Sequence, residues 1–132
     1  MKRTLLFLLL LLLAYALFSQ SYFISKRNVV CFYNQKTKAY DICGDIQNED
    51  CIFKIPNDEV YISFTNQEGT SVYYVMDRVV KDSQFWFSVR YNSEIKHIVV
   101  VDIPNKEIRV FIYDSENSAI IYYLIDDMWT SD

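Results

Sequence analysis

Short polar breaks divide the chain after residue 28 into apolar runs, and the length of these breaks limits how the runs can be connected. The breaks are NQKTK, GDIQNED, PNDE, NQEGT, KDSQ, NSE, PNKE and DSENS, of three to seven residues each. A break of this length closes a hairpin between antiparallel strands, whereas a crossover between parallel strands needs roughly a dozen residues or more. The sequence therefore predicts antiparallel strands that follow one another along the chain.

The apolar runs alternate with the period of two that is typical of β-strands. In VYISFT, residues 60–65, every second residue is apolar, and 85–91 and 108–113 show the same period. The expected strands are 29–34, 39–43, 51–55, 60–65, 71–80, 85–91, 96–103, 107–113 and 118–126. No helix is predicted after the N-terminal segment, except for a short turn at 21–27.

These strands predict an all-β fold, an antiparallel up-and-down meander of about eight or nine strands. An open meander leaves two edge strands unpaired, and closing into a small barrel removes them. A strongly bent sheet or a two-layer sandwich is the alternative.

The N-terminus has the features of a secretory signal peptide. Lys2 and Arg3 precede an apolar stretch, residues 5–18, which ends in small and polar residues. The stretch is shorter than the roughly 20 residues that a membrane-spanning helix needs. We expect a signal peptide at 1–19, cleaved after Ser19 or alternatively after Ala16, a single all-β domain at 20–132, and a secreted or periplasmic location. An uncleaved anchor is the other interpretation.

The charge of the chain after the leader argues against two classes of partner. Removing Lys2 and Arg3 leaves eleven Lys and Arg against seventeen Asp and Glu, a net charge of about −6. Nucleic acids require a basic surface, because it replaces the counterions of the phosphates. Anionic membrane surfaces likewise attract basic segments. We therefore expect neither nucleic acid nor a membrane surface as a partner once the leader is removed.

Three cysteines follow the leader, so the chain can form at most one internal disulfide. Cys43 and Cys51 flank the segment GDIQNED, and they would lie near facing strand ends if this segment closes a hairpin. We therefore predict a disulfide between Cys43 and Cys51. The alternative is that all three cysteines, including Cys31, are small buried apolar residues.

Two segments of the chain resemble each other. IPNDE at 55–59 and IPNKE at 103–107 share four of five residues, and a tyrosine pair follows each of them. Proline presets φ for the first central position of a turn and asparagine tolerates the second, so each segment is expected to connect two strands. Repeated turn chemistry, an internal duplication and a functional motif used twice remain as interpretations.

The sequence contains no recognisable catalytic motif. The single histidine, His97, lies in a strand pattern, and we expect it on a strand face rather than as a base or metal ligand. Asp45, Gln47 and Glu49 place alternate oxygens in one loop, but the glycine is misplaced for a calcium site. We therefore predict no enzyme activity, no catalytic residue, no metal and no cofactor. The C-terminal aspartates from Asp126 onward are expected in a solvated tail.

Several segments together resemble a known class of protein. The leucine-rich leader ends in FSQS, the first strands carry YNQKTKAYDICG, a turn reads IPNKE, and the C-terminal strands are rich in tyrosine. In these features the chain resembles the small secreted all-β proteins of unassigned function from Bacteroidetes-type genomes. The resemblance covers most of the chain after the leader. It implies export and a β-fold, and it assigns no activity and no functional residues.

The expected strand 118–126 is apolar on both faces, which predicts a contact surface. Such a strand is either covered on two sides or contacts a partner. We therefore expect Ile121, Tyr123 and Ile125 to form an interaction face for another envelope or secreted protein, which makes the chain a non-enzymatic interaction module. The alternative is a lipocalin-like carrier of a small apolar ligand, although the Gly-x-Trp signature of lipocalins is missing from the start of the mature chain.

Overall fold

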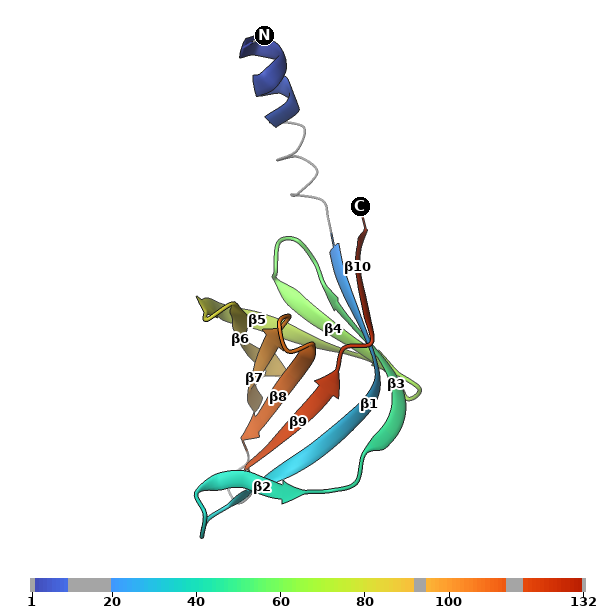
Figure 1. Ribbon diagram of the computed structural model, residues 1–132, viewed down its shortest axis with the longest axis vertical. Helices are drawn as coiled ribbons and strands as arrows, with labels where there is room; N and C mark the ends of the chain where they lie inside the picture. The colour runs from blue at the N-terminus through green and yellow to red at the C-terminus, as the bar shows by residue number, and fades with distance from the viewer. Residues whose placement is uncertain (1, 10–19, 92–94, 114–117, 132) are drawn as a thin grey trace.

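The computed structural model describes residues 2–9, 20–91, 95–113 and 118–131 (Figure 1). Residues 2–9 form a short helix within the predicted leader, and the predicted cleavage positions lie outside the described residues. The described part of the chain holds no helix that is long and apolar enough to span a membrane.

Among the described residues, ten antiparallel strands follow residue 19, which confirms the predicted all-β fold. They are β1 (Gln20–Asn34), β2 (Ala39–Cys43), β3 (Gln47–Ile55), β4 (Tyr61–Asn66), β5 (Gly69–Lys81), β6 (Gln84–Tyr91), β7 (Ile95–Asp102), β8 (Glu107–Tyr113), β9 (Ser118–Leu124) and β10 (Asp127–Ser131). Eight of them, β1 and β3 to β9, close into a barrel, and β2 and β10 are outer strands (Figure 1). The strands from β3 to β9 are neighbours in chain order, as the short breaks predict.

The barrel closes through β1, which is much longer than the sequence predicts. It pairs with β3 through Ser21–Asn28 and with β9 through Asn28–Phe32. A register shift between Ser25 and Arg27 bends the strand at this point. The expected turn at 21–27 is therefore wrong, because β3 pairs with this stretch and β10 pairs with its first half. The expected C-terminal tail is solvated as predicted, but residues 127–131 form a strand, β10, against the start of β1.

Apolar side chains fill the barrel interior. Phe53 packs on Phe64 and on Tyr123, with ring centroids 4.9 and 5.0 Å apart. The buried core contains Phe23, Cys51, Phe53, Ile55, Ile62, Phe87, Val89, Val99, Val101, Ile108, Val110 and Tyr123. Alternation along each strand places these residues on the inner face and their polar neighbours on the outer face.

The two IPN segments form different turns at the same end of the barrel. In IPNKE, the Lys106 amide donates to the Ile103 carbonyl at 3.0 Å. In IPNDE, the Glu59 amide donates to the Pro56 carbonyl at 3.0 Å, so the closing bond is shifted by one residue within the shared sequence. Ile55 and Ile103 border one small apolar cavity. Each segment connects two consecutive strands, as predicted, but the repeated sequence does not form one repeated turn.

Candidate interaction surface

The predicted interaction face on β9 faces the core of the barrel. Tyr123 is buried among Phe53 and Phe64, and Ile121 and Ile125 pack against the same core. β9 pairs with β8 on one side and with β1 on the other, so one face of the strand has to point inward. The prediction that Ile121, Tyr123 and Ile125 form an exposed contact surface is therefore wrong.

The disulfide joins Cys31 to Cys43, so the predicted bridge between Cys43 and Cys51 is wrong. β2 and β3 do not pair with each other, because each of them pairs with β1 instead. Cys31 and Cys43 are direct partners across β1 and β2, with Cα atoms 4.0 Å apart. Cys51 is free and buried in the core, and burial, together with the nearby Glu49, raises the pKa of its thiol to about 12. A thiol with this pKa is a poor nucleophile at neutral pH.

The disulfide closes a hairpin, residues 31–43, that extends beyond the barrel; we call it the disulfide hairpin. Its tip is ordered by local bonds. The Lys38 amide donates to the Asn34 carbonyl at 2.8 Å, and the Lys36 amide donates to the Asn34 side-chain oxygen at 3.0 Å. The Thr37 hydroxyl donates to Asp41 at 2.6 Å, and this bond lowers the pKa of the Asp41 carboxyl. The hairpin is therefore braced at its base and at its tip.

Aromatic contacts hold the disulfide hairpin against the outer wall of the barrel. Tyr40 lies edge-on to Phe111 on β8, with ring centroids 6.3 Å apart. Phe111 in turn stacks on Trp86 of β6 at 6.1 Å. Tyr33 packs on Tyr40 at 5.2 Å and adds to this contact. The hairpin thus has a defined position relative to the barrel.

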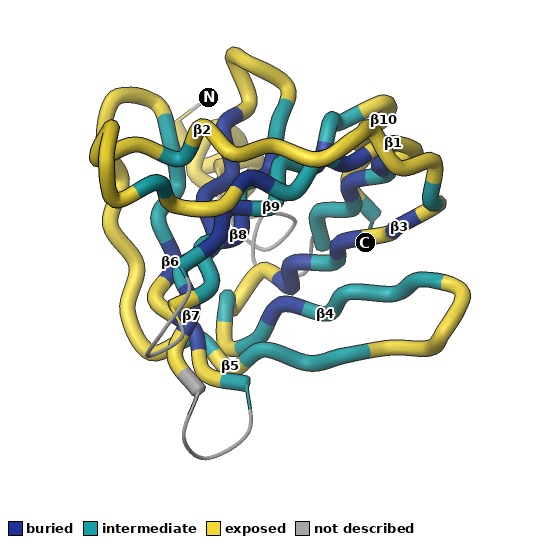
Figure 2. Tube along the Cα trace, turned by 90° about the horizontal axis from the view of Figure 1, so that it is seen from below, coloured by how far each residue is buried: buried dark blue, intermediate teal, exposed yellow. Residues whose placement is uncertain are grey.

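The other face of the disulfide hairpin presents two apolar side chains to solvent. Phe32 and Ile42 are direct partners across β1 and β2, and they lie on the opposite face from the disulfide. Their exposed fractions are 46% and 51%. Figure 2 shows that most of β2 is exposed. We call Phe32 and Ile42 the hairpin patch.

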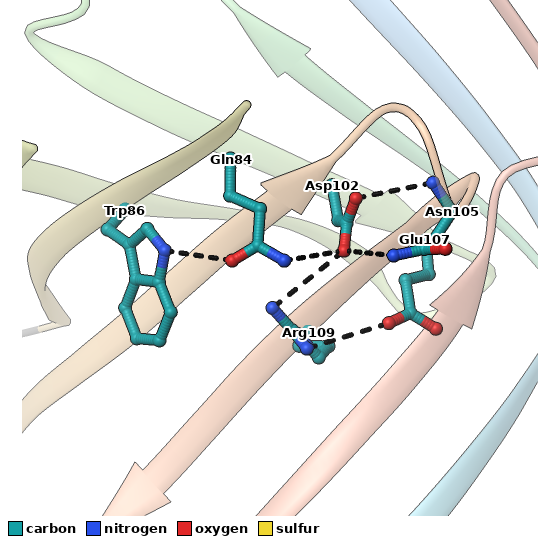
Figure 3. A network of polar contacts seen from close by, with 6 residues as sticks. All are labelled: Gln84, Trp86, Asp102, Asn105, Glu107 and Arg109. Carbon is teal, nitrogen blue, oxygen red and sulfur yellow. Dashed lines mark hydrogen bonds and ion pairs between the residues drawn. The ribbon is translucent and has the colours of Figure 1, made fainter. Parts of the chain in front are cut away.

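A polar network on the outer wall supports the turn between β7 and β8 (Figure 3). The buried Asp102 carboxylate accepts hydrogen bonds from the Gln84 amide at 2.7 Å and from the Asn105 amide at 2.9 Å. The Asn105 backbone N–H donates to the second carboxylate oxygen at 3.2 Å. The hydrogen bonds from Asn105 contribute most to lowering the pKa of Asp102. The bond from Gln84 and the positive charge of the nearby Arg109 contribute less. Each partner lies on a neighbouring strand or in the turn, so the network is explained by its structural role.

The rest of the network is an arginine stacked on a tryptophan. The Arg109 guanidinium lies over the Trp86 ring at 6.0 Å and within 4.0 Å of the Asp102 carboxylate. Glu107 lies 3.7 Å from the guanidinium on its other side. The Trp86 indole N–H donates to the Gln84 side-chain oxygen at 3.1 Å. The charge of Arg109 is thus already balanced by two carboxylates of the barrel wall.

His97 lies on β7 with its ring edge-on to Tyr73 of β5, at 5.9 Å between centroids. It is buried, and its Nδ1 atom has no hydrogen-bond partner among the described residues. Burial lowers the pKa of the imidazole, which therefore stays neutral near pH 7. Within the described ranges, no group of three or more His, Cys, Asp or Glu side chains is arranged to hold a metal ion.

The apolar cavity beside the two IPN turns is small. Its volume is about 130 Å³, and Phe23, Phe87 and Met128 contribute to its lining. Pockets for small molecules typically measure roughly 300 Å³ or more. This cavity therefore gives little support to the carrier alternative.

The hairpin patch was not predicted, although the sequence contains a signal for it. Cys31 lies three residues before the NQKTK break and Cys43 lies five residues after it, so a hairpin closed by that break brings the two cysteines close together. Phe32 and Ile42 follow as the next pair inside the bridge. Comparison of the chain with protein-family models, curated proteins and solved structures yields no significant match.

Proposed function

We propose that the protein is an exported, non-enzymatic module of the cell envelope that binds another protein through the hairpin patch. The observation that supports this proposal is the exposure of Phe32 and Ile42 on a hairpin that a disulfide and aromatic contacts hold in one position. A rigid apolar pair loses little conformational freedom on binding, so more of the free energy gained by burying it contributes to the affinity.

The surroundings of the patch indicate what kind of surface would bind there. Lys36 and Lys38 are exposed at the tip of the disulfide hairpin, in a chain with a net charge of −4. Protein interfaces commonly combine an apolar centre with a polar, charged rim. The partner is therefore expected to offer an apolar groove with acidic residues at its edge.

Export is supported by the features of the leader, and the disulfide is compatible with an oxidising compartment. The polar groups described in the barrel wall serve turns and strand pairing, which supports a binding role over catalysis.

Site-specific photo-crosslinking in cells that produce the full-length chain tests this proposal. A photoreactive amino acid in place of Ile42 should yield a defined adduct with another protein, and Phe32→Ser should abolish it. The matched control is the exposed pair Val79 and Val80 on β5, with exposed fractions of 53% and 57%. A crosslinker in place of Val80 should give no such adduct, and Val79→Ser should not affect the adduct formed at position 42. Equal labelling from positions 42 and 80 would contradict the proposal.

A further inference from the structure

β10 has one edge without a strand partner among the described residues. It stands at the end of the sheet order and pairs only with β1. β9 pairs with the later half of β1 and β10 with its beginning, so β9 does not pair with the free edge of β10. An unpaired edge exposes backbone N–H and C=O groups that can extend the sheet with another strand.

One hydrogen bond shows which residues of β10 point their backbone groups to the free edge. The Met128 amide donates to the Asp127 carboxylate at 2.9 Å, so this N–H is directed away from β1. In an antiparallel pair, alternate residues direct their backbone groups to the same side. Thr130 therefore shares the free edge with Met128, and its N–H is available there.

The side chains of β10 make this edge suitable for pairing. Trp129 stacks flat on Tyr22 of β1, with centroids 5.2 Å apart and an interplanar angle of 10°. It remains 40% exposed, and Met128 on the opposite face is 44% exposed. The strand contains neither proline nor lysine, the residues that commonly protect an edge.

The sequence of β10 is complementary to itself in antiparallel register. When two copies of Asp127–Ser131 are centred on Trp129, Met128 of each copy lies opposite Thr130 of the other. The free Thr130 N–H of each copy then meets the Met128 carbonyl of the other. Asp127 is the one charged residue of β10, and it lies opposite Ser131 of the other copy. The two Asp127 carboxylates are therefore not placed opposite each other. The two Trp129 side chains become direct cross-strand neighbours.

We propose that β10 pairs with β10 of a second copy of this chain, about a two-fold axis at Trp129. The resulting dimer joins two barrels through a continuous sheet. Because the same surface serves both copies, the assembly is closed and stops at two chains. The hairpin patch lies near the other end of β1, so this proposal is independent of the binding function proposed above.

Charge substitution at the axis tests the proposal. Protein purified from cells that express the full-length chain is analysed by sedimentation and native mass spectrometry. The wild type should be a dimer, and both Trp129→Lys and Trp129→Glu should be monomers, because each places like charges opposite one another. An equal mixture of the two variants should recover a dimer that contains one copy of each. A strand that simply fails to form could not produce this recovery.

Three further variants complete the test. Thr130→Pro removes the free N–H and should also give a monomer, whereas Val79→Lys on β5 should leave the dimer intact. The double variant Phe32→Ser with Ile42→Thr should dimerise like the wild type. A monomeric wild type at the highest concentration, a dimeric Trp129→Lys variant, or a mixture that stays monomeric would each overturn the proposal.

Discussion

Cys31 and Cys43 lie directly opposite each other on β1 and β2, and their disulfide fixes β2 to the barrel. Among the strands that the structure describes, β2 pairs only with β1, through a few residues at the end of β1. The bridge therefore stabilises a local element, and the hairpin patch depends on it for its position.

Replacing both cysteines, Cys31→Ala with Cys43→Ala, should release β2 and leave the barrel folded. The bridge spans 12 residues, and the loss of such a loop constraint costs roughly 2–3 kcal/mol by the chain-entropy estimate. Hydrogen exchange should show faster exchange of the β2 amides with unchanged protection in β7 and β8. If β7 and β8 lost protection as well, the disulfide would support the whole barrel, contrary to this expectation.

Substitutions on β9 distinguish its inner face from its outer face. Tyr123→Ala should lower the free energy of unfolding by about 3–5 kcal/mol, because it leaves a cavity beside Phe53 and Phe64. Tyr122→Ala, on the neighbouring half-buried residue, should cost clearly less. Urea denaturation of both variants measures the difference. Equal effects would mean that Tyr123 is not part of the core.

Stability should fall in mild acid because of His97. Burial lowers its pKa in the folded state, whereas the unfolded chain has the ordinary value of about 6.5. Below that pH the unfolded state binds more protons, so its population rises as the pH falls. The contribution of neutral His97 to the free energy of unfolding is complete above about pH 6.5. It is lost as the pH falls below that value.

The measurement is the urea midpoint at a series of pH values from neutral to mildly acidic. His97→Gln should have a flatter profile than the wild type over this range. The substitution also removes the edge-on contact with Tyr73 and lowers the urea midpoint at every pH, so the slope and not the absolute midpoint is the readout. An unchanged slope would exclude His97 as the titrating group.

Asp102→Asn should destabilise the fold, since the charged acceptor for Gln84 and Asn105 is lost and Arg109 keeps only Glu107. A hydrogen bond to a charged group contributes about 1.5–3 kcal/mol, and a loss of that size is expected in urea denaturation. The exposed Asp45→Asn is the control and should be close to neutral. The pKa of Asp102 is lowered in the folded state, so its contribution is present at neutral pH and disappears in strong acid. Equal stability of the two variants would contradict the structural role of the network.

Local patterns were sufficient to predict most strands and their chain order. The period of two in segments such as 60–65 and 85–91 reflects which side of a strand is buried, and that property repeats within a few residues. The short breaks left only hairpins as connections. β4, β6, β7 and β8 therefore lie within one or two residues of their expected positions.

The hairpin patch lies on a local hairpin, and the NQKTK break was a signal for it. The closure of the barrel, in contrast, depends on pairing between distant segments. The polar stretch Ser25–Asn28 becomes part of a strand because β3 pairs with it, and β9 joins β1 on the other side from Asn28 onward. For the same reason, the buried face of β9 follows from the position of β1. A single sequence shows how apolar and polar residues alternate along a strand, but it does not show which strand lies beside it.

The sequence by itself determined the all-β class, the antiparallel meander and the turn positions, because alternation and turn chemistry act over a few neighbouring residues. The tertiary structure alone decided which face of β9 is buried and that β2 and β10 pair with β1 outside the barrel. The physical reason is that closure requires one long strand to satisfy backbone hydrogen bonds on both sides. The partners of that strand are set by the register of the whole sheet.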